Sequence, residues 1–209
     1  VSAFLLNRSS DLDLLFSVEE KQFIRTYFDE ALERCEHNFK QSVNKYYYRI
    51  ENGERVAFFN PYHSVQYMTF LYYLSNTLYK KGCSSILCDK LYYLNKILNS
   101  VDLFYAIDLP DYYHADHPVG SVMGRAQYGF GFQFLQGCTV GGSYGKDGTL
   151  YYPVIEDNVR MYANSSIIGR CHIGKNTQVG AGALVKNQDV PANSIVFGQS
   201  PNLIIKSAH

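Results

Sequence analysis

Two histidines and an aspartate lie close together near the middle of the chain, in a stretch rich in glycine. They are His114, Asp116 and His117, and Pro-Val-Gly-Ser-Val-Met-Gly follows them. An imidazole titrates near neutrality, so it accepts a proton from a hydroxyl group without strong perturbation. A carboxylate on its second nitrogen fixes the tautomer and favours the imidazolium that forms. The segment therefore predicts general-base chemistry, with His117 as the base.

The acid that orients His117 is left open by the sequence. Asp116 is its neighbour in the chain, and Asp108 and Asp111 lie a little upstream in Ile-Asp-Leu-Pro-Asp. His114 either shares the catalytic role or is an ordinary surface or core histidine.

These residues stand where the pattern of the chain changes, near residue 108. Beyond it, every sixth residue in two runs is aliphatic, Met or aromatic: Val122, Tyr128, Phe134 and Val140, then Ile155, Met161, Ile167, Ile173, Val179 and Val185. Four places after the later ones come mostly small residues: Val159, Ser165, Cys171, Thr177 and Ala183. Neither a helix nor an ordinary strand keeps a strict period of six. The repeat predicts a β-helix, with the large residues inside and the small ones at its corners.

The two runs are out of phase, because Val140 and Ile155 are fifteen residues apart. The segment 142–153, Gly-Ser-Tyr-Gly-Lys-Asp-Gly-Thr-Leu-Tyr-Tyr-Pro, is therefore predicted to leave the coil as a protruding loop. Loops that project from a rigid scaffold commonly carry function.

The first half, residues 1–107, predicts a helical domain with one hairpin. Ser17-Val-Glu-Glu20 is a capping box for a first helix, which turns Ile24, Phe28, Ala31 and Cys35 inward. Residues 46–50 and 55–59 flank Asn52-Gly53, which suits a type I′ turn because both central residues take positive φ.

Two more helices are expected before the repeat begins. One starts with Asn60 as N-cap and Pro61 at the first helical position, and it stops near Lys80-Lys81-Gly82. The other follows Ser84-Ser85 and carries an inward stripe: Leu87, Leu91, Leu94, Leu98, Val101 and Tyr105. The fold class is therefore α+β, a helical region with a β-hairpin followed by a β-helix over residues 108–209.

Composition excludes several classes of partner. Lys and Arg number 19, and so do Asp and Glu, so bulk charge attracts neither nucleic acid nor an anionic membrane. The five cysteines form no CxxC pair, which predicts neither a disulfide framework nor a zinc site and suits a reducing cytoplasm. No stretch approaches the roughly 20 apolar residues of a membrane span. The first residues, Val1–Leu15, lack the pattern of a signal peptide.

Three segments together resemble the hexapeptide-repeat acyltransferases, and more narrowly their serine-acetyltransferase-like branch: Asp116-His117, Gln136-Gly-Cys-Thr-Val-Gly-Gly142, and the closing coils Ile155–Ser200. The likeness covers residues 108 to 205. It implies that the β-helix is left-handed, that acetyl-CoA is the co-substrate without a metal, and that the acetyl group passes directly to the acceptor. It also implies a homotrimer with CoA between neighbouring β-helices.

The resemblance further implies a set of site residues. His117 would be the general base, with Asp116, Asp108 and His114 as the other catalytic candidates. The family's CoA contacts map onto small residues: Gly141, Gly142, Ser143, Ala163 and Ala181. Lys186 is added as a phosphate partner on its charge alone.

Two departures from the branch concern the acceptor. The branch has a His before the proline that closes the loop and a Glu after the Asp-His stretch, whereas this chain has Tyr152 and Arg125. In this respect the chain looks more like the O-acetyltransferases of capsular polysaccharides, including those that modify sialic acid. Arg125 and Lys146 then suit a sugar carboxylate, and Tyr144 and Tyr152 suit a sugar ring.

The expected function is therefore acetyl-CoA-dependent O-acetylation of a bacterial surface glycan. The alternatives are a serine O-acetyltransferase of cysteine biosynthesis, an amino-sugar N-acetyltransferase and a non-catalytic β-helix scaffold. Replacing His117 by Ala separates the enzymes from the scaffold, because only an enzyme loses its turnover.

Overall fold

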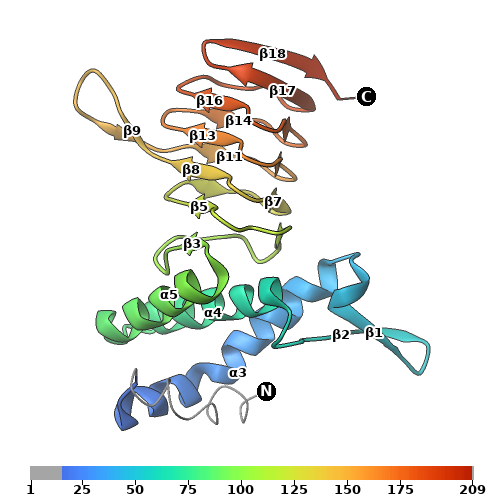
Figure 1. The fold of residues 1–209 in the computed structure, drawn as a ribbon, viewed down its shortest axis with the longest axis vertical. Coiled ribbons are helices and arrows are strands. Elements are labelled where there is room, and N and C mark those ends of the chain that lie inside the picture. Colours follow the sequence, from blue (N-terminus) through green and yellow to red (C-terminus); the bar gives the residue numbers. More distant parts are fainter. Residues whose placement is uncertain (1–15, 209) are drawn as a thin grey trace. The chain divides into compact units, whose positions relative to one another are not determined.

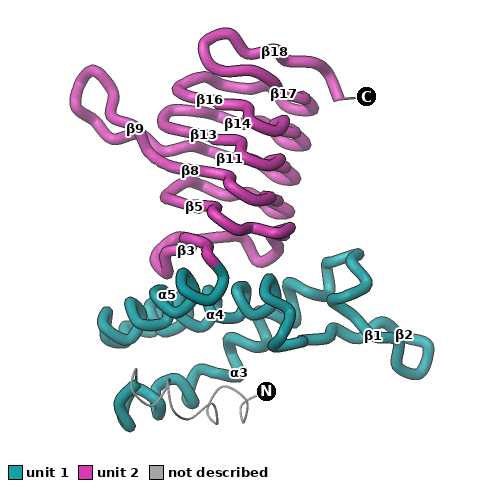
Figure 2. The backbone as a smooth tube through the Cα atoms, in the orientation of Figure 1, with its two compact units in different colours: residues 1–99 teal, residues 100–209 magenta. Residues whose placement is uncertain are grey.

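The computed structural model describes residues 16–208, which fold as two units divided between Asn99 and Ser100 (Figure 2). The division expected from the repeat, at residue 108, lies further along the chain. Val1–Leu15, where no signal peptide was predicted, lie outside the described residues. Within residues 16–208, no helix is long and apolar enough to cross a bilayer.

The first unit is built from three helices and a hairpin. Its elements are α3 (Val18–Gln41), a 3₁₀ turn η1 (Lys45–Tyr47), β1 (Tyr48–Glu51), β2 (Glu54–Ala57), α4 (Ser64–Lys80) and α5 (Ser85–Asn99). Helix α4 packs against both α3 and α5, and almost every residue from Val65 to Leu78 is buried. Polar side chains on this buried helix are bonded to its neighbours. Arg34 of α3, for example, donates to Thr77 Oγ1 at 2.8 Å.

Two local predictions for this unit are confirmed. The capping box is present, since Glu20 N donates to Ser17 Oγ at 3.1 Å and Ser17 N donates to the Glu20 carboxylate at 2.7 Å. The hairpin turns at Asn52 and Gly53, whose φ angles are 52° and 85°, as a type I′ turn requires.

Two other local predictions are wrong. Helix α4 begins at Ser64 with His63 as N-cap, one turn after Asn60. The Asn60 side chain instead accepts from Tyr62 N at 3.0 Å and closes a turn. The stripe predicted for the third helix also stops early, because α5 ends at Asn99 and Leu98 is 54% exposed.

The second unit is the predicted β-helix, a left-handed stack of coils with three faces (Figure 1). Face I consists of β4 (Tyr113–Ala115), β7 (Phe132–Phe134), β12 (Arg160–Met161) and β15 (Gln178–Val179). Face II consists of β3 (Asp102–Leu103), β5 (Val122–Met123), β8 (Thr139–Gly141), β13 (Ser166–Ile168) and β16 (Leu184–Lys186). Face III consists of β6 (Gln127–Tyr128), β11 (Val154–Ile155) and β14 (His172–Ile173). The antiparallel pair β17 (Ser194–Gln199) and β18 (Asn202–Ser207) closes the stack.

Each face contributes one column of inward side chains to the core. On face II the column is Leu103, Met123, Val140, Ile167 and Val185, and all five are buried. The six-residue count therefore places one residue wrongly. Val122 points outward and is 39% exposed, whereas Met123 is 1% exposed. The reason is a short corner, since Met123 and Tyr128 are five positions apart but Ile167 and Ile173 are six.

Asparagine and glycine turn the corners between faces. Asn158, Asn176 and Asn193 have φ angles of 56°, 58° and 55°, a left-handed conformation that Asn tolerates better than most residues. Their side chains form a ladder, with Asn176 Nδ2 bonded to Asn193 Oδ1 at 2.9 Å. Beside the turn residues sit the small residues of the repeat, such as Ser165 and Ala183, which are buried.

Two edges border face II. We call the corner between faces I and II the histidine edge, comprising residues 116–121, 135–138, 162–165 and 180–183. We call the corner between faces II and III the loop edge, comprising residues 124–126, 142–153, 169–171 and 187–189. From the loop edge a hairpin of β9 (Ser143–Tyr144) and β10 (Leu150–Tyr151) projects away from the coil (Figure 1).

Candidate active site

His117 lies on the histidine edge in an unusual backbone conformation. Its φ is 48°, and its carbonyl accepts from Val119 N at 2.7 Å in a tight turn. The regular turn residues of this edge are Gly120, Gly137, Asn164 and Gly182, so His117 is a left-handed residue added to the series. Such a conformation costs a residue with a side chain on the order of 1 kcal/mol, and residues of this kind cluster at functional sites.

The ring of His117 is available to a ligand. The residue is exposed, and its side chain makes no hydrogen bond or ion pair with any residue that the structure describes. An unpartnered imidazole next to a rigid corner suits a general base that meets its proton donor only when the acceptor binds.

Asp116 does not orient His117 in this structure. Its carboxylate oxygen Oδ1 lies 3.0 Å from Nε2 of His114, and its backbone N donates to Phe134 O at 3.0 Å. The His114 side chain is only 14% exposed. The pair His114–Asp116 therefore forms a fixed contact on face I, next to the turn that carries His117.

Asp102 is another candidate acid, which the sequence did not indicate. It is half-buried on β3, and its N donates to Ser121 O at 2.8 Å, while Gly120 N donates to Ser100 O at 2.7 Å. These bonds place Asp102 on the strand directly beside the turn of His117. Asp108 and Asp111, by contrast, are exposed in the segment between β3 and β4. The inward column of face II continues from Met123 to Leu103 in the preceding coil. Recognising Leu103 as part of this column would have placed its neighbour Asp102 beside the coil of His117.

The predicted CoA contacts fall on both edges of face II. Ala163 and Ala181 lie on the histidine edge, in the coils above His117, and Gly182 N donates to Ala163 O at 2.9 Å. The other predicted contacts border the loop edge: Gly141, Gly142, Ser143 and Lys186. At Gly141 the nearest atom to an added Cβ is Ile168 Cδ1 at 3.9 Å, so the backbone there is open to a ligand.

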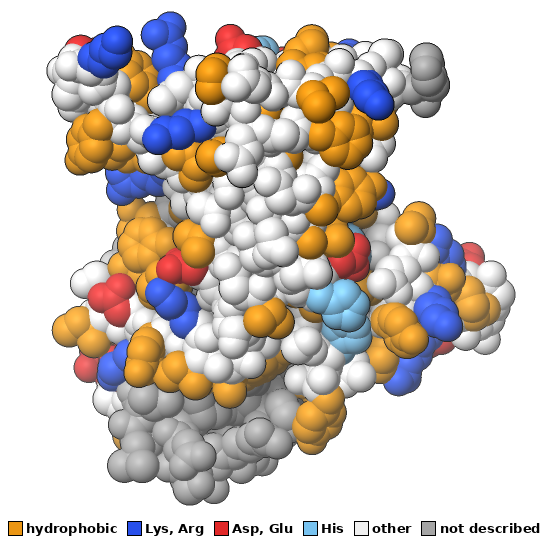
Figure 3. Space-filling model, turned by 45° about the horizontal axis from the view of Figure 1, so that its top comes forward, with side chains coloured by type: hydrophobic (Ala, Val, Ile, Leu, Met, Phe, Trp, Pro, Cys, Tyr) orange, Lys and Arg blue, Asp and Glu red, His pale blue; other side chains and the backbone are white. Residues whose placement is uncertain are grey.

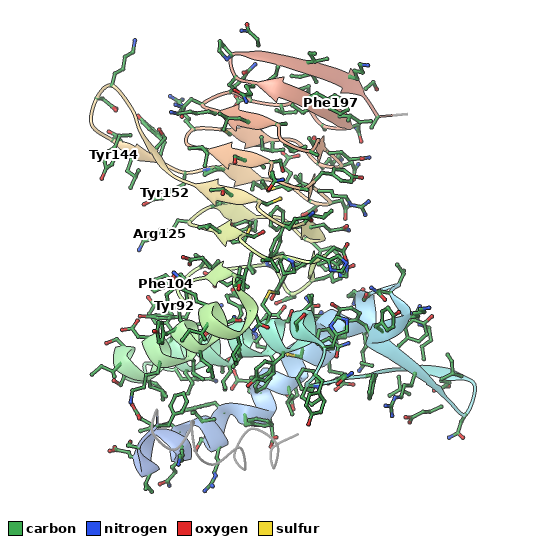
Figure 4. All side chains as sticks on the ribbon, viewed as in Figure 1. Tyr92, Phe104, Arg125, Tyr144, Tyr152 and Phe197 are labelled. Carbon is green, nitrogen blue, oxygen red and sulfur yellow. The ribbon has the colours of Figure 1, made fainter. Side chains whose placement is uncertain are left out.

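The predicted acceptor residues all lie on the loop edge. Figure 4 shows Arg125, Tyr144 and Tyr152 pointing away from the β-helix on the side where the hairpin projects. Tyr144 is 72% exposed, and Lys146 is exposed at the tip of the hairpin. Figure 3 shows that Lys and Arg side chains gather on this side of the β-helix.

The hairpin has its own internal bonds. The Asp147 carboxylate accepts from Thr149 N at 3.0 Å and from Tyr151 Oη at 2.9 Å. These hydrogen bonds hold the pKa of Asp147 below its ordinary value. The Arg170 guanidinium lies over the Tyr151 ring, 5.6 Å from its centre, and links the base of the hairpin to the next coil.

A single copy of the chain does not bring the two edges together. Gly120 on the histidine edge and Arg125 on the loop edge are separated by five residues of extended chain, roughly 16 Å. His117 and the acceptor residues are therefore at opposite borders of face II. Among residues 16–208, no group of three or more His, Cys, Asp or Glu side chains is placed to hold a metal ion.

Known proteins match both the repeat and the whole fold. A family model described as bacterial transferase hexapeptide (six repeats) matches residues 152–187. A serine acetyltransferase of Bacillus pumilus is 29% identical over 126 residues, which are 56% of this chain and 57% of that protein. One from Synechococcus elongatus is 32% identical over 56% of this chain and 48% of its own length. The chain thus spans about half the length of these relatives.

A solved structure extends the match. The crystal structure of a Neisseria gonorrhoeae serine acetyltransferase in complex with serine has a TM-score of 0.65 at 26% identity, and the match covers 86% of this chain and 71% of that one.

These matches correct one expectation. The capsular polysaccharide or sialic acid acceptor inferred from Tyr152 and Arg125 is wrong, because the matching proteins are serine acetyltransferases. Two residues that differ from the branch near the acceptor are weaker evidence for the acceptor than the similarity of the repeat as a whole. The chain therefore resembles the hexapeptide-repeat acyltransferases, and within them their serine-acetyltransferase-like branch.

Proposed function

We propose that this protein is an acetyl-CoA-dependent O-acetyltransferase whose acceptor is L-serine. The observation that carries the proposal is the exposed, unpartnered His117 held in a left-handed turn on the histidine edge. The named activity of the relatives supports both the acetyl donor and the acceptor. The assignment as an acetyltransferase needs only His117 and the likeness to acetyltransferases, whereas the choice of L-serine also needs the acceptor named for the relatives.

In this mechanism His117 is the general base. Its ring nitrogen takes the proton from the serine hydroxyl while that oxygen attacks the thioester carbonyl of acetyl-CoA. When the carbon–sulfur bond breaks, His117 returns the proton to the sulfur, so that O-acetylserine and CoA leave with the proton count balanced. Asp102, on the adjoining strand, is the acid we assign to stabilise the imidazolium. Backbone N–H groups at Gly141 and Gly142 are assigned to the oxyanion, and at Gly141 the backbone is open to a ligand.

We further propose that the site is shared between copies of the chain in a homotrimer. In a ring, each copy presents two different surfaces to its two neighbours. The histidine edge of one copy, with His117, Ala163 and Ala181, then meets the loop edge of the next. A groove of this kind gathers the predicted residues that one copy keeps roughly 16 Å apart.

We also infer a cytoplasmic location, in line with the substrates. All five cysteines are free thiols, and four of them are buried. This inference is supported by the absence of any disulfide to maintain.

The test is the release of CoA thiol from acetyl-CoA, measured with L-serine and with amino sugars as acceptors. We expect release that needs L-serine and falls by about 10²- to 10⁴-fold in His117→Ala. His37→Ala, which removes an exposed histidine from α3, is the matched control and should keep full activity. Release with amino sugars alone would overturn the choice of L-serine, and full activity in His117→Ala would overturn the mechanism.

A further inference from the structure

Four cations border the loop edge: Arg125, Lys146, Arg170 and Lys186. They do not lie at the same height along the β-helix. Arg125 is in the coil that runs from β4 through β5 to β6, the same coil that carries His117. Arg170 lies two coils further on and Lys186 three, which is roughly 10 Å and 14 Å along the axis at the spacing of neighbouring strands.

Height matters because the proposed site is shared between copies. We place the threefold axis of the proposed trimer along the β-helix, and rotation about such an axis leaves every coil at its own level. The coil of His117 in one copy therefore faces the coil of Arg125 in its neighbour. An acceptor whose hydroxyl reaches His117 lies at the level of Arg125, whereas Arg170 and Lys186 are too high to reach the same small molecule.

Arg125 is also the cation whose side chain is available to a ligand. It is exposed, and it has no hydrogen bond, ion pair or ring contact with any described part of the chain. Arg170, in contrast, is stacked on Tyr151. Figure 4 shows Arg125 on the same side of the β-helix as Tyr152, with Phe104 of the preceding coil below it.

From this geometry we infer that Arg125 of the neighbouring copy binds the carboxylate of the acceptor and so determines that the enzyme takes an α-amino acid rather than a neutral alcohol. The inference rests on the proposed function. A guanidinium holds a carboxylate through two parallel N–H···O bonds, which orients the molecule as well as attracting it. With the carboxylate fixed, the serine hydroxyl is left to point toward the His117 side of the groove.

The first experiment compares two acceptors and two proteins. L-serinamide keeps the hydroxyl of L-serine but replaces its carboxylate by a neutral amide. In the unaltered enzyme we expect kcat/KM for L-serinamide to be lower than for L-serine by about 10- to 100-fold, as for the loss of one charged hydrogen-bonded pair. In Arg125→Gln we expect kcat/KM for L-serine to fall by the same factor, while that for L-serinamide stays within about twofold.

Two further variants keep this comparison interpretable. Arg125→Lys retains the charge without the paired geometry and should recover part of the loss. Lys175→Gln removes an exposed positive charge beyond β14, away from face II, and should change neither acceptor's kcat/KM. If Arg125→Gln weakens both acceptors equally, or neither, the inference fails. If the unaltered enzyme ignores L-serine while it acetylates another acceptor, the proposed function fails instead.

The second experiment tests whether the two residues come from different copies. His117→Ala and Arg125→Gln chains, each with its own tag, are co-expressed, and the mixed trimers are purified and assayed at L-serine concentrations far below KM. In each mixed trimer, about one third of the sites then pair an intact His117 with an intact Arg125 of the neighbour. Recovery of activity toward that level supports the inference. Mixed trimers no more active than Arg125→Gln alone would overturn it.

Discussion

The register of the coil that carries both His117 and Arg125 can be tested by one pair of substitutions. Met123 and Val122 are adjacent, but only Met123 belongs to the inward column of face II. It is 1% exposed, whereas Val122 is 39% exposed. A six-residue count makes the opposite assignment, so the two readings predict opposite results for Met123→Ala and Val122→Ala.

The magnitudes follow from burial. Met123→Ala removes three buried heavy atoms from a column bounded by Leu103 and Val140, and a fully buried Met replaced by Ala costs about 2–5 kcal/mol. Val122→Ala removes two methyl groups that are partly in water. At about 0.8 kcal/mol per fully buried carbon, the expected loss is about 1 kcal/mol or less.

The assay is urea unfolding followed by circular dichroism at one protein concentration, because assembly makes the apparent stability of an oligomer depend on concentration. The free energy of unfolding should fall by at least about 1 kcal/mol more in Met123→Ala than in Val122→Ala. Equal losses, or a larger loss in Val122→Ala, would show that the outward assignment of Val122 is incorrect. The levels assigned to His117 and Arg125 would then be incorrect as well.

Two more predictions concern the loop edge. A Cβ on Gly142 would lie 2.9 Å from Tyr152 Cε1 and 3.0 Å from Leu150 Cδ1, whereas on Gly141 it meets nothing closer than 3.9 Å. Gly142→Ala should therefore displace the hairpin and lower kcat/KM by about 10²-fold, as a misplacement of about 1 Å does. Gly141→Ala should leave the unfolding free energy and the hairpin unchanged and weaken only CoA binding. Steady-state kinetics and CoA titration measure these effects, and an equal loss in both variants would contradict the prediction. The pKa of Asp147 is lowered by its bonds from Thr149 N and Tyr151 Oη, so its hold on the hairpin is complete above the ordinary carboxylate range and is lost as the pH falls through the lowered value. Asp147→Asn, which mimics the protonated side chain, should reduce protection of the Thr149 amide from hydrogen exchange at pH 7, and unchanged protection would disprove that role.

The amino-acid sequence alone determined the architecture of this protein. A strict repeat of six with small residues at the corners is compatible with a β-helix and with neither a helix nor an ordinary strand. The capping box at Ser17 and the turn at Asn52-Gly53 were also predicted from the sequence, because a cap and a two-residue turn depend on residues that are neighbours in the chain. The general base also followed from the sequence, as a candidate, from His117 and its surroundings.

The arrangement of the site was decided by the tertiary structure. The corner between β5 and β6 is one residue shorter than the repeat expects, so Val122 points outward and Met123 points inward. Counting by six along the chain cannot detect a corner of different length. Asp116 pairs with His114 although it adjoins His117, while the pairing of β3 with β5 places Asp102, from the preceding coil, on the strand beside the turn of His117. Face II separates the residues expected to act together, because its two corners lie at opposite ends of its strands. Sequence neighbours share a covalent backbone, but side chains meet only where the coils stack, and that stacking exists only in the folded chain.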